Sequence, residues 1–217
     1  DQQAILDNPQ IDIVFIFVPP WLRRSLLVPA AETGKHILTT KPLGPNAEEC
    51  AAMVQAVESS DIHCGVIYNR TRHEKSETWH ERIETYRQIF DSGEIGQLAL
   101  LRHDWVHHYP QWNTWALDPT KNGGPFMDAM IHNLNAARYL MARPTTQGIF
   151  FSDNHAHPDL SCNDTELLKL DFEDRGSAHL FITWAADLEV FSTAGNSREH
   201  IDIMYLITDQ GWRLTHA

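Results

Sequence analysis

The sequence predicts an α/β protein in two parts: a parallel sheet with its helices, then an α+β domain with a largely antiparallel sheet. Strand and helix patterns alternate over the first third of the 217 residues, as βαβ units require. Residues 11–18, IDIVFIFV, are almost wholly apolar, as expected for a parallel strand covered on both faces. In the second half, residues 166–174 and 177–185 flank a short Asp-Arg-Gly turn and predict an antiparallel hairpin.

Local signals bound the elements of the first part. Pro19-Pro20 end the first strand, and Gly34 closes the next helix. Asn46 and Glu49 form a capping box, which predicts that a helix begins there. The expected elements are a helix end over residues 2–8, strands over 11–18, 36–40 and 64–68, and helices over 21–33 and from 46 onwards.

The second part begins with a long amphipathic helix over residues 75–91. Its apolar face carries Trp79, Ile83, Tyr86 and Phe90. Strands are expected over residues 97–105, 166–174, 177–185 and 200–208, with an aromatic loop and a further helix after the first of them.

That further helix follows a paired glycine in residues 120–136, TKNGGPFMDAMIHNLNA. Pro125 suits a first helical position. Helical spacing predicts a buried stripe of Met127, Met130, Ile131, Leu134 and Met141. Asp128, His132, Asn135 and Tyr139 share another face. Spacing alone leaves two interpretations open, a solvated polar face with an Asp–His pair or a functional site.

Composition narrows the class of protein. The formal net charge of −12 argues against nucleic acid or an anionic membrane as a partner, because both favour clusters of lysine and arginine. No apolar run approaches the roughly 20 residues of a membrane helix. Three cysteines without CxxC spacing indicate reduced thiols and a cytoplasmic protein. The chain starts at Asp1, so a targeting segment remains compatible with this expectation.

Six landmarks together resemble the Gfo/Idh/MocA family of NAD(P)-dependent oxidoreductases. They are IDIVFIFVPP, AAETGKHILTTKPLG, VIYNRTRH, FDSGEIGQL, NGGPFMDAMIHNLNAARYL and a hairpin ending in ITWA, in the family's order over essentially the whole chain. The resemblance implies that residues 1–70 are the C-terminal part of a dinucleotide-binding Rossmann domain. Residues 71–217 would then be a substrate-binding and oligomerisation domain with an open-faced sheet, truncated at its end.

The glycine-rich turn of that family has no match in this sequence. Family members open with a strand, a G-x-G-x-x-G turn and a helix that together hold the pyrophosphate. Two βα units, roughly 60 residues, precede this point in the family pattern. We therefore expect the chain to be a fragment that lacks the phosphate-binding portion.

The resemblance implies NAD or NADP as cofactor and a catalytic set of Lys41, Asp128 and His132. Oxidation of a secondary alcohol needs a base for the hydroxyl proton and a donor that steadies the alkoxide. A neutral imidazole and a lysine suit these tasks. Without the resemblance, Lys41 would be interpreted as a solvated loop lysine.

Further site residues follow from their places in the pattern. The expected cofactor contacts are Val18, Pro19, Trp21, Thr40, Lys41, Pro42 and Asn69. The expected substrate contacts are Lys41, Tyr109, Trp115, Asp128 and His132, because aromatic rings pack on the C–H faces of sugars and cyclitols. The aromatic loop, which also contains Trp112, is equally compatible with a core or interface role.

Three positions and one strand-end motif depart from the family pattern. Thr40 replaces a glutamate before the lysine, Met130 a glycine and Asn135 an aspartate. In the strand-end motif, usually Thr-Pro followed by a stretch containing histidine, residues 18–23 read VPPWLR. These departures affect the cofactor pocket and substrate choice, and they leave the proposed catalytic groups in place.

Thirteen histidines raise the question of a metal site. His103, His107 and His108 cluster in one stretch, but no zinc pattern such as HExxH accompanies them. We expect no metal.

The resulting functional hypothesis is hydride transfer between a nicotinamide and a secondary alcohol of a sugar, cyclitol or related polyol. The rivals are a non-catalytic dinucleotide-binding regulator and an interaction module on the same fold. Partners would be a small molecule and further copies of the chain, which would associate through the open sheet face.

Overall fold

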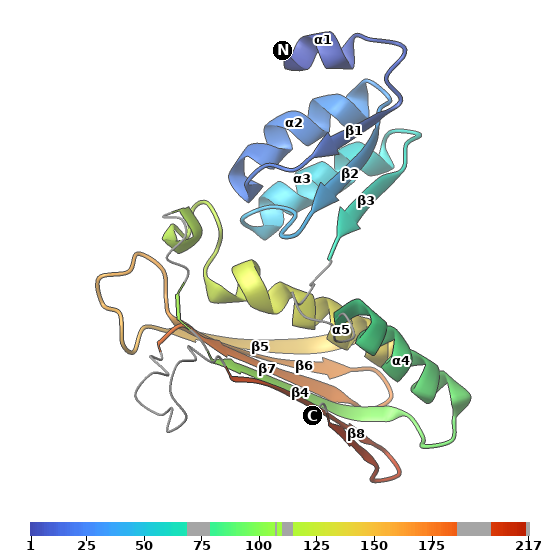
Figure 1. Ribbon diagram of the computed structural model, residues 1–217, viewed down its shortest axis with the longest axis vertical. Helices are drawn as coiled ribbons and strands as arrows, with labels where there is room; N and C mark the ends of the chain where they lie inside the picture. The colour runs from blue at the N-terminus through green and yellow to red at the C-terminus, as the bar shows by residue number, and fades with distance from the viewer. Residues whose placement is uncertain (69–78, 107, 110–114, 186–200, 216–217) are drawn as a thin grey trace.

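A parallel sheet with helices on one side forms the first part of the molecule (Figure 1). The structure is a computed structural model and describes residues 1–68, 79–106, 108–109, 115–185 and 201–215. Strands follow one another in the order β1-β2-β3, and both pairs are parallel. The elements are α1 (Gln2–Leu6), β1 (Ile13–Ile16), α2 (Pro20–Glu32), β2 (His36–Thr40), α3 (Ala47–Glu58) and β3 (Cys64–Ile67).

Both crossover helices cover the same face of this sheet. The strand order advances in one direction, so two right-handed crossovers bring α2 and α3 to one side. The core between them contains Leu27, Ile37 and Met53. On the other face, Phe15 and Phe17 are 65% and 58% exposed. No element of the described chain packs on this second face, so only one face of the strand predicted over residues 11–18 is covered within the described residues.

The second part is a six-stranded sheet in the order β5-β6-β7-β4-β8-β9. Every neighbouring pair is antiparallel except β4 and β7. The elements are α4 (Trp79–Ser92), β4 (Leu98–Val106), the 3-10 turn η1 (Trp115–Leu117), the π turn η2 (Phe126–Met130), α5 (Ile131–Met141), β5 (Thr145–Asp153), β6 (Thr165–Phe172), β7 (Ser177–Thr183), β8 (Ile201–Thr208) and β9 (Arg213–Thr215).

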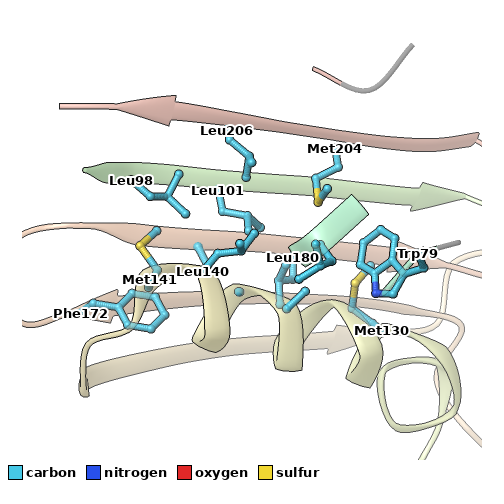
Figure 2. Close-up of a cluster of buried hydrophobic side chains, with 14 of the residues drawn as sticks. Trp79, Leu98, Leu101, Met130, Leu140, Met141, Phe172, Leu180, Met204 and Leu206 are labelled. Atoms are coloured by element: carbon cyan, nitrogen blue, oxygen red, sulfur yellow. The ribbon is translucent and has the colours of Figure 1, made fainter. Parts of the chain in front are cut away.

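Helices α4 and α5 pack on one face of this sheet (Figure 1). Figure 2 shows the core they enclose, which contains Trp79 of α4, Leu140 of α5, and Leu180 and Leu206 of the strands. No helix of the described residues covers the opposite face, which is called the open face below. It carries apolar and charged side chains together, namely Arg102, Asp104, Ile149, Phe151, Leu167, Lys169, His179, Phe181 and Ile203.

Most expected elements are confirmed within a few residues, and the hairpin of β6 and β7 is confirmed. Strand β5 was not predicted, because it is an exposed edge strand with Gln147-Gly148 inside it. The helix after the paired glycine begins with a π turn, not with an α-helical turn. Among the described residues, no helix is long and apolar enough to cross a membrane.

Candidate functional site

Lys41 follows directly on β2, at the carboxyl edge of the parallel sheet. The Lys41 amide donates to the Ile67 carbonyl at 3.0 Å, which extends the pairing of β2 with β3 by one residue. The buried Thr39 hydroxyl donates to the Ile16 carbonyl of β1 at 2.8 Å. These bonds fix the end of β2 against both neighbours, so the Lys41 side chain leaves the sheet at the edge where open α/β sheets bind ligands.

The Lys41 ammonium reaches the second domain. Its Nζ donates a hydrogen bond to the main-chain carbonyl of Asp128, in the π turn. The Asp128 carboxylate accepts from the Asn122 side-chain amide at 3.1 Å. Asn122 is fully buried and also donates to the Ala116 carbonyl at 3.3 Å. The lysine and the aspartate that the sequence singled out therefore lie together, and Asn122 orients the aspartate.

His132 lies in the first turn of α5 and is 7% exposed. Its Nδ1 is 3.1 Å from the carbonyl oxygen of Tyr68, the residue after β3. A carbonyl can only accept, so Nδ1 carries the hydrogen, and in the neutral ring Nε2 is the basic nitrogen. The contact fixes both the tautomer and the ring orientation. It also brings His132 to the same sheet edge as Lys41, since β2 and β3 are neighbours.

The paired glycine allows the chain to pass close to both domains. Gly123 and Gly124 have φ of +82° and +87°, which favour glycine. A Cβ on Gly123 would lie 3.0 Å from the Pro45 carbonyl, and one on Gly124 would lie 3.1 Å from Glu166 Oε1. Side chains at either position would separate the π turn from its surroundings.

Glu166 of β6 binds the start of the π turn. Its Oε2 accepts from the Phe126 amide at 2.5 Å, and Oε1 accepts from the Ser152 hydroxyl at 3.2 Å. The side chain faces the helices and the residue is 5% exposed. Burial raises the pKa of this carboxyl to about 7.

Arg23 is a second buried charge at the site, on the first part of the molecule. Its guanidinium donates to the carbonyls of Val18, Pro42 and Leu43, the residues that follow β1 and β2. Burial lowers its pKa from the usual value, and the residue is 1% exposed.

The expected cofactor residues lie along one edge, at the carboxyl ends of the parallel strands. Val18 and Pro19 follow β1, Trp21 is in the first turn of α2, Thr40 ends β2 and Pro42 follows Lys41 through a cis peptide bond. Asn69 lies outside the described residues.

The two expected aromatic substrate contacts lie in different surroundings. The Trp115 ring packs on Trp21 with centroids 5.2 Å apart, so it joins the two domains beside the strand ends. Lys121 Nζ lies 5.8 Å from the Trp21 ring centroid. The Tyr109 ring instead contacts His157 at 4.9 Å. Trp112 is outside the described residues.

One histidine of the cluster, His103, has a structural role in the core. His103 is fully buried, with Nε2 2.5 Å from an Asp202 carboxylate oxygen and Nδ1 beside the Asn133 amide. Within the described ranges, no three His, Cys, Asp or Glu side chains gather as metal ligands.

Sequence reasoning missed Asn122, Glu166 and Tyr68, and it treated Arg23 only as a departure from a motif. The one available signal was the type of residue. Asn122 stands immediately before a paired glycine, and Glu166 alternates with the apolar Leu168 and Leu170, so both are polar residues at positions that fold inward.

Two sequence families match the chain. Residues 83–198 match the GFO/IDH/MocA C-terminal domain, and residues 1–68 match the oxidoreductase family with an NAD-binding Rossmann fold. The first match alone covers more than half of the chain.

Curated relatives and solved structures agree with these matches. An uncharacterized oxidoreductase, YrbE of Bacillus subtilis (strain 168), is 28% identical over 91% of the chain and 58% of its own length. Levoglucosan dehydrogenase of Pseudarthrobacter phenanthrenivorans is 30% identical over 65% of the chain and 36% of its own length. The scyllo-inositol 2-dehydrogenase (NAD(+)) of B. subtilis is 29% identical over 67% of the chain and 40% of its own length.

Solved structures show the same fold. A levoglucosan dehydrogenase in complex with NADH superposes with a TM-score of 0.78 at 20% identity, covering 99% of this chain and 56% of that one. The chain thus spans little more than half the length of the relatives it matches. From the two family matches, the fold and the shared order of elements, we conclude that the chain belongs to the GFO/IDH/MocA family of oxidoreductases.

Proposed function

We propose that the complete protein is an NAD(P)-dependent dehydrogenase that moves hydride between the nicotinamide and a secondary alcohol carbon of a sugar, cyclitol or related polyol. The observation that carries the proposal is the hydrogen bond from the Lys41 ammonium to the main chain of Asp128. Beside it lies His132, whose tautomer is fixed by the Tyr68 carbonyl. A base and a donor at one strand edge are what alcohol oxidation requires.

The donor groups at this edge fit the ring side of a nicotinamide cofactor. Carboxyl ends of parallel strands converge there, apolar groups of Val18 and Pro19 flank them, and Lys41 adds a cationic donor. The bound cofactor would supply the acceptor or donor of hydride. Val18, Pro19, Trp21, Thr40 and Pro42 remain the residues we propose to hold it.

His132 and Lys41 would share the proton chemistry. Since Nδ1 donates to the Tyr68 carbonyl, Nε2 of the neutral ring would take the hydroxyl proton of the substrate. The Lys41 ammonium would donate to the same oxygen and steady its developing negative charge. We propose that Asp128 tunes this pair, with its carboxylate held by Asn122 and its main chain by Lys41.

Relatives motivate the substrate class. The names levoglucosan dehydrogenase, scyllo-inositol 2-dehydrogenase and myo-inositol 2-dehydrogenase describe enzymes that act on ring polyols. The Trp115 ring, which packs at an angle of 57° on Trp21, would offer an apolar face to such a ring. We further propose that the complete protein acts in the cytoplasm and self-associates through the open face of the six-stranded sheet, without nucleic acid or membrane as a partner.

The test uses the protein expressed from its complete reading frame. Each of NAD⁺ and NADP⁺ is combined with myo-inositol, scyllo-inositol, levoglucosan and glucose, and formation of the reduced cofactor is followed by absorbance. We expect turnover with at least one pair and its loss in Lys41→Met. Tight cofactor binding without turnover of any ring polyol would instead favour a dinucleotide-binding regulator, the rival that needs no base. An interaction module would bind neither cofactor.

A further inference from the structure

Arg23 joins the ends of β1 and β2 from beneath the proposed site. One terminal nitrogen, Nη1, donates to the Pro42 carbonyl and, at 3.1 Å, to the Leu43 carbonyl. The other, Nη2, donates to the Val18 carbonyl at 2.5 Å. Pro42 directly follows Lys41, so the guanidinium holds the backbone on which Lys41 is mounted.

The burial of this charge needs an explanation. Arg23 is 1% exposed, and within the described residues it pairs with main-chain carbonyls and with no carboxylate. Its Nε has no hydrogen-bond partner in that same part of the chain. Burying a cation without a counter-charge opposes folding. Hydrogen bonds to three carbonyls offset part of this cost, because an apolar side chain of the same volume would leave those carbonyls without the guanidinium donors.

The shape of the guanidinium explains why an arginine occupies this position. The planar guanidinium carries donors on two nitrogens, and it binds Val18 on one strand end and Pro42 and Leu43 on the other at the same time. Lys41 must in turn reach the Asp128 carbonyl across the domain boundary. A shift of its backbone by a fraction of an ångström would move the ammonium away from the reacting oxygen.

We propose that Arg23 is a positioning residue for Lys41: it fixes the loop after β2 so that the lysine ammonium stays at the proton-transfer site. The inference rests on the proposed function of Lys41. Arg23 itself touches neither substrate nor cofactor in this proposal.

The test compares Arg23→Lys and Arg23→Gln with a neighbouring control, Arg24→Lys, in the complete protein. Arg24 pairs with Glu49 at 2.9 Å, with its side chain 46% exposed, so its replacement leaves the loop after β2 unaltered. With the ring polyol that the wild type turns over, we expect both Arg23 variants to lower kcat by at least about tenfold, with KM changed much less. The primary isotope effect with deuterated alcohol should rise, because hydride transfer becomes slower relative to product release. Arg24→Lys should match the wild type.

A second readout needs no substrate. The rate of reductive methylation of the Lys41 amine, followed by mass spectrometry, should increase in the Arg23 variants and not in Arg24→Lys, because the amine leaves its contact with Asp128. An unchanged kcat together with an unchanged methylation rate would overturn the proposal. Loss of folded protein in both Arg23 variants would also overturn it, since Arg23 would then serve the stability of the domain. If Lys41→Met retains full activity, the proposed function fails instead, and the methylation rates still decide whether Arg23 holds the loop.

Discussion

Lys41 and Asp128 are joined by a hydrogen bond between the ammonium of one and the main-chain carbonyl of the other, across 87 positions of sequence. The lysine ends a strand of the parallel sheet, and the aspartate lies in the π turn that begins α5. The same boundary is crossed by His132, whose Nδ1 meets the Tyr68 carbonyl. Two independent contacts therefore dock the start of α5 on the carboxyl edge of the parallel sheet, and the predictions below depend on that docking.

Replacement of His132 by alanine should remove the proposed base. We expect kcat to fall by roughly 10²- to 10⁴-fold, which is the usual contribution of general base catalysis. Cofactor affinity, measured by fluorescence titration, should change little. His80→Ala is the matched control, because that histidine is on α4 with 72% of its side chain exposed. Equal rates for the two variants would show that His132 is a structural histidine.

Asn122 should influence kcat through the hydrogen bond that its side-chain amide donates to the Asp128 carboxylate. Asn122→Asp would put a carboxylate where an amide now donates to a carboxylate, and the two charges would repel each other. We expect Asn122→Asp to lower kcat more than Asn122→Ala does at neutral pH, although aspartate is the closer match in shape. Steady-state kinetics of the two variants test this ordering, and the reverse ordering would remove Asn122 from the site.

Glu166 should make stability depend on pH. Its pKa is raised from 4.5 to about 7 by burial, so between these values the folded chain binds a proton that the unfolded chain releases. Its contribution to stability is therefore full below pH 4.5 and is lost as pH rises through 7. The loss in unfolding free energy is roughly 3 kcal/mol. The neighbouring thiol of Cys162, with its pKa raised to about 11 by burial, stays neutral throughout this window.

Glu166→Gln isolates the contribution of this carboxyl to the pH dependence of stability. The glutamine amide oxygen can still accept from the Phe126 amide, but it does not titrate. In urea unfolding, the variant should match the wild type near pH 4.5 and be more stable above pH 7. Other titrating groups contribute equally to both proteins and cancel in the difference. Parallel curves for the two proteins would mean that the carboxylate is solvated.

The helix of the candidate site shows how far sequence patterns reach. The order of elements follows local rules of turns, caps and strand ends, whereas the approach of Asp128 and His132 to Lys41 was implied by the family resemblance and not by any local pattern. The predicted stripe was only partly right: Met130 and Met141 are buried, whereas Ile131 and Leu134 are only half-buried. Fully buried positions on this helix also include Asn133, Ala136, Ala137 and Leu140.

Two physical reasons account for the difference. A π turn precedes α5, so the spacing of an uninterrupted α-helix does not apply across it. Asn133 is buried because its amide meets His103, 30 residues away on β4, and no local pattern reports that partner. The same holds for Arg23 and Glu166, whose partners are main-chain groups that only the tertiary fold brings near.

Gly123 should not tolerate a side chain. In Gly123→Ala, the Cβ would meet the Met127 Cγ at 2.9 Å and the Pro45 carbonyl at 3.0 Å, in addition to the cost of a positive φ. Gly34→Ala is the control, because its φ is +75° and no heavy atom lies within 4 Å of the added Cβ. The control should lose only the stability that a non-glycine residue at positive φ costs, about 1 kcal/mol. We expect Gly123→Ala to lower both Tm and kcat further, since Pro45 follows the Lys41 loop. Equal Tm losses would show that the close approach is relaxed in solution.

The open face of the six-stranded sheet should carry the proposed self-association. Phe151 and Ile203 on this face are 58% and 54% exposed, and apolar area of this kind favours burial against another surface. A second copy is the expected partner, since Arg102–Asp104 and Lys169–Asp171 pairs on the same face give it charges of both signs. Phe151→Arg should therefore shift the complete protein toward monomer in light scattering at micromolar concentration. Trp212→Arg is the control, because Trp212 is equally exposed at 57% but lies in the turn between β8 and β9. If both variants keep the mass of the wild type, the open face is not the interface between copies, and if both become monomeric, the turn belongs to that interface as well.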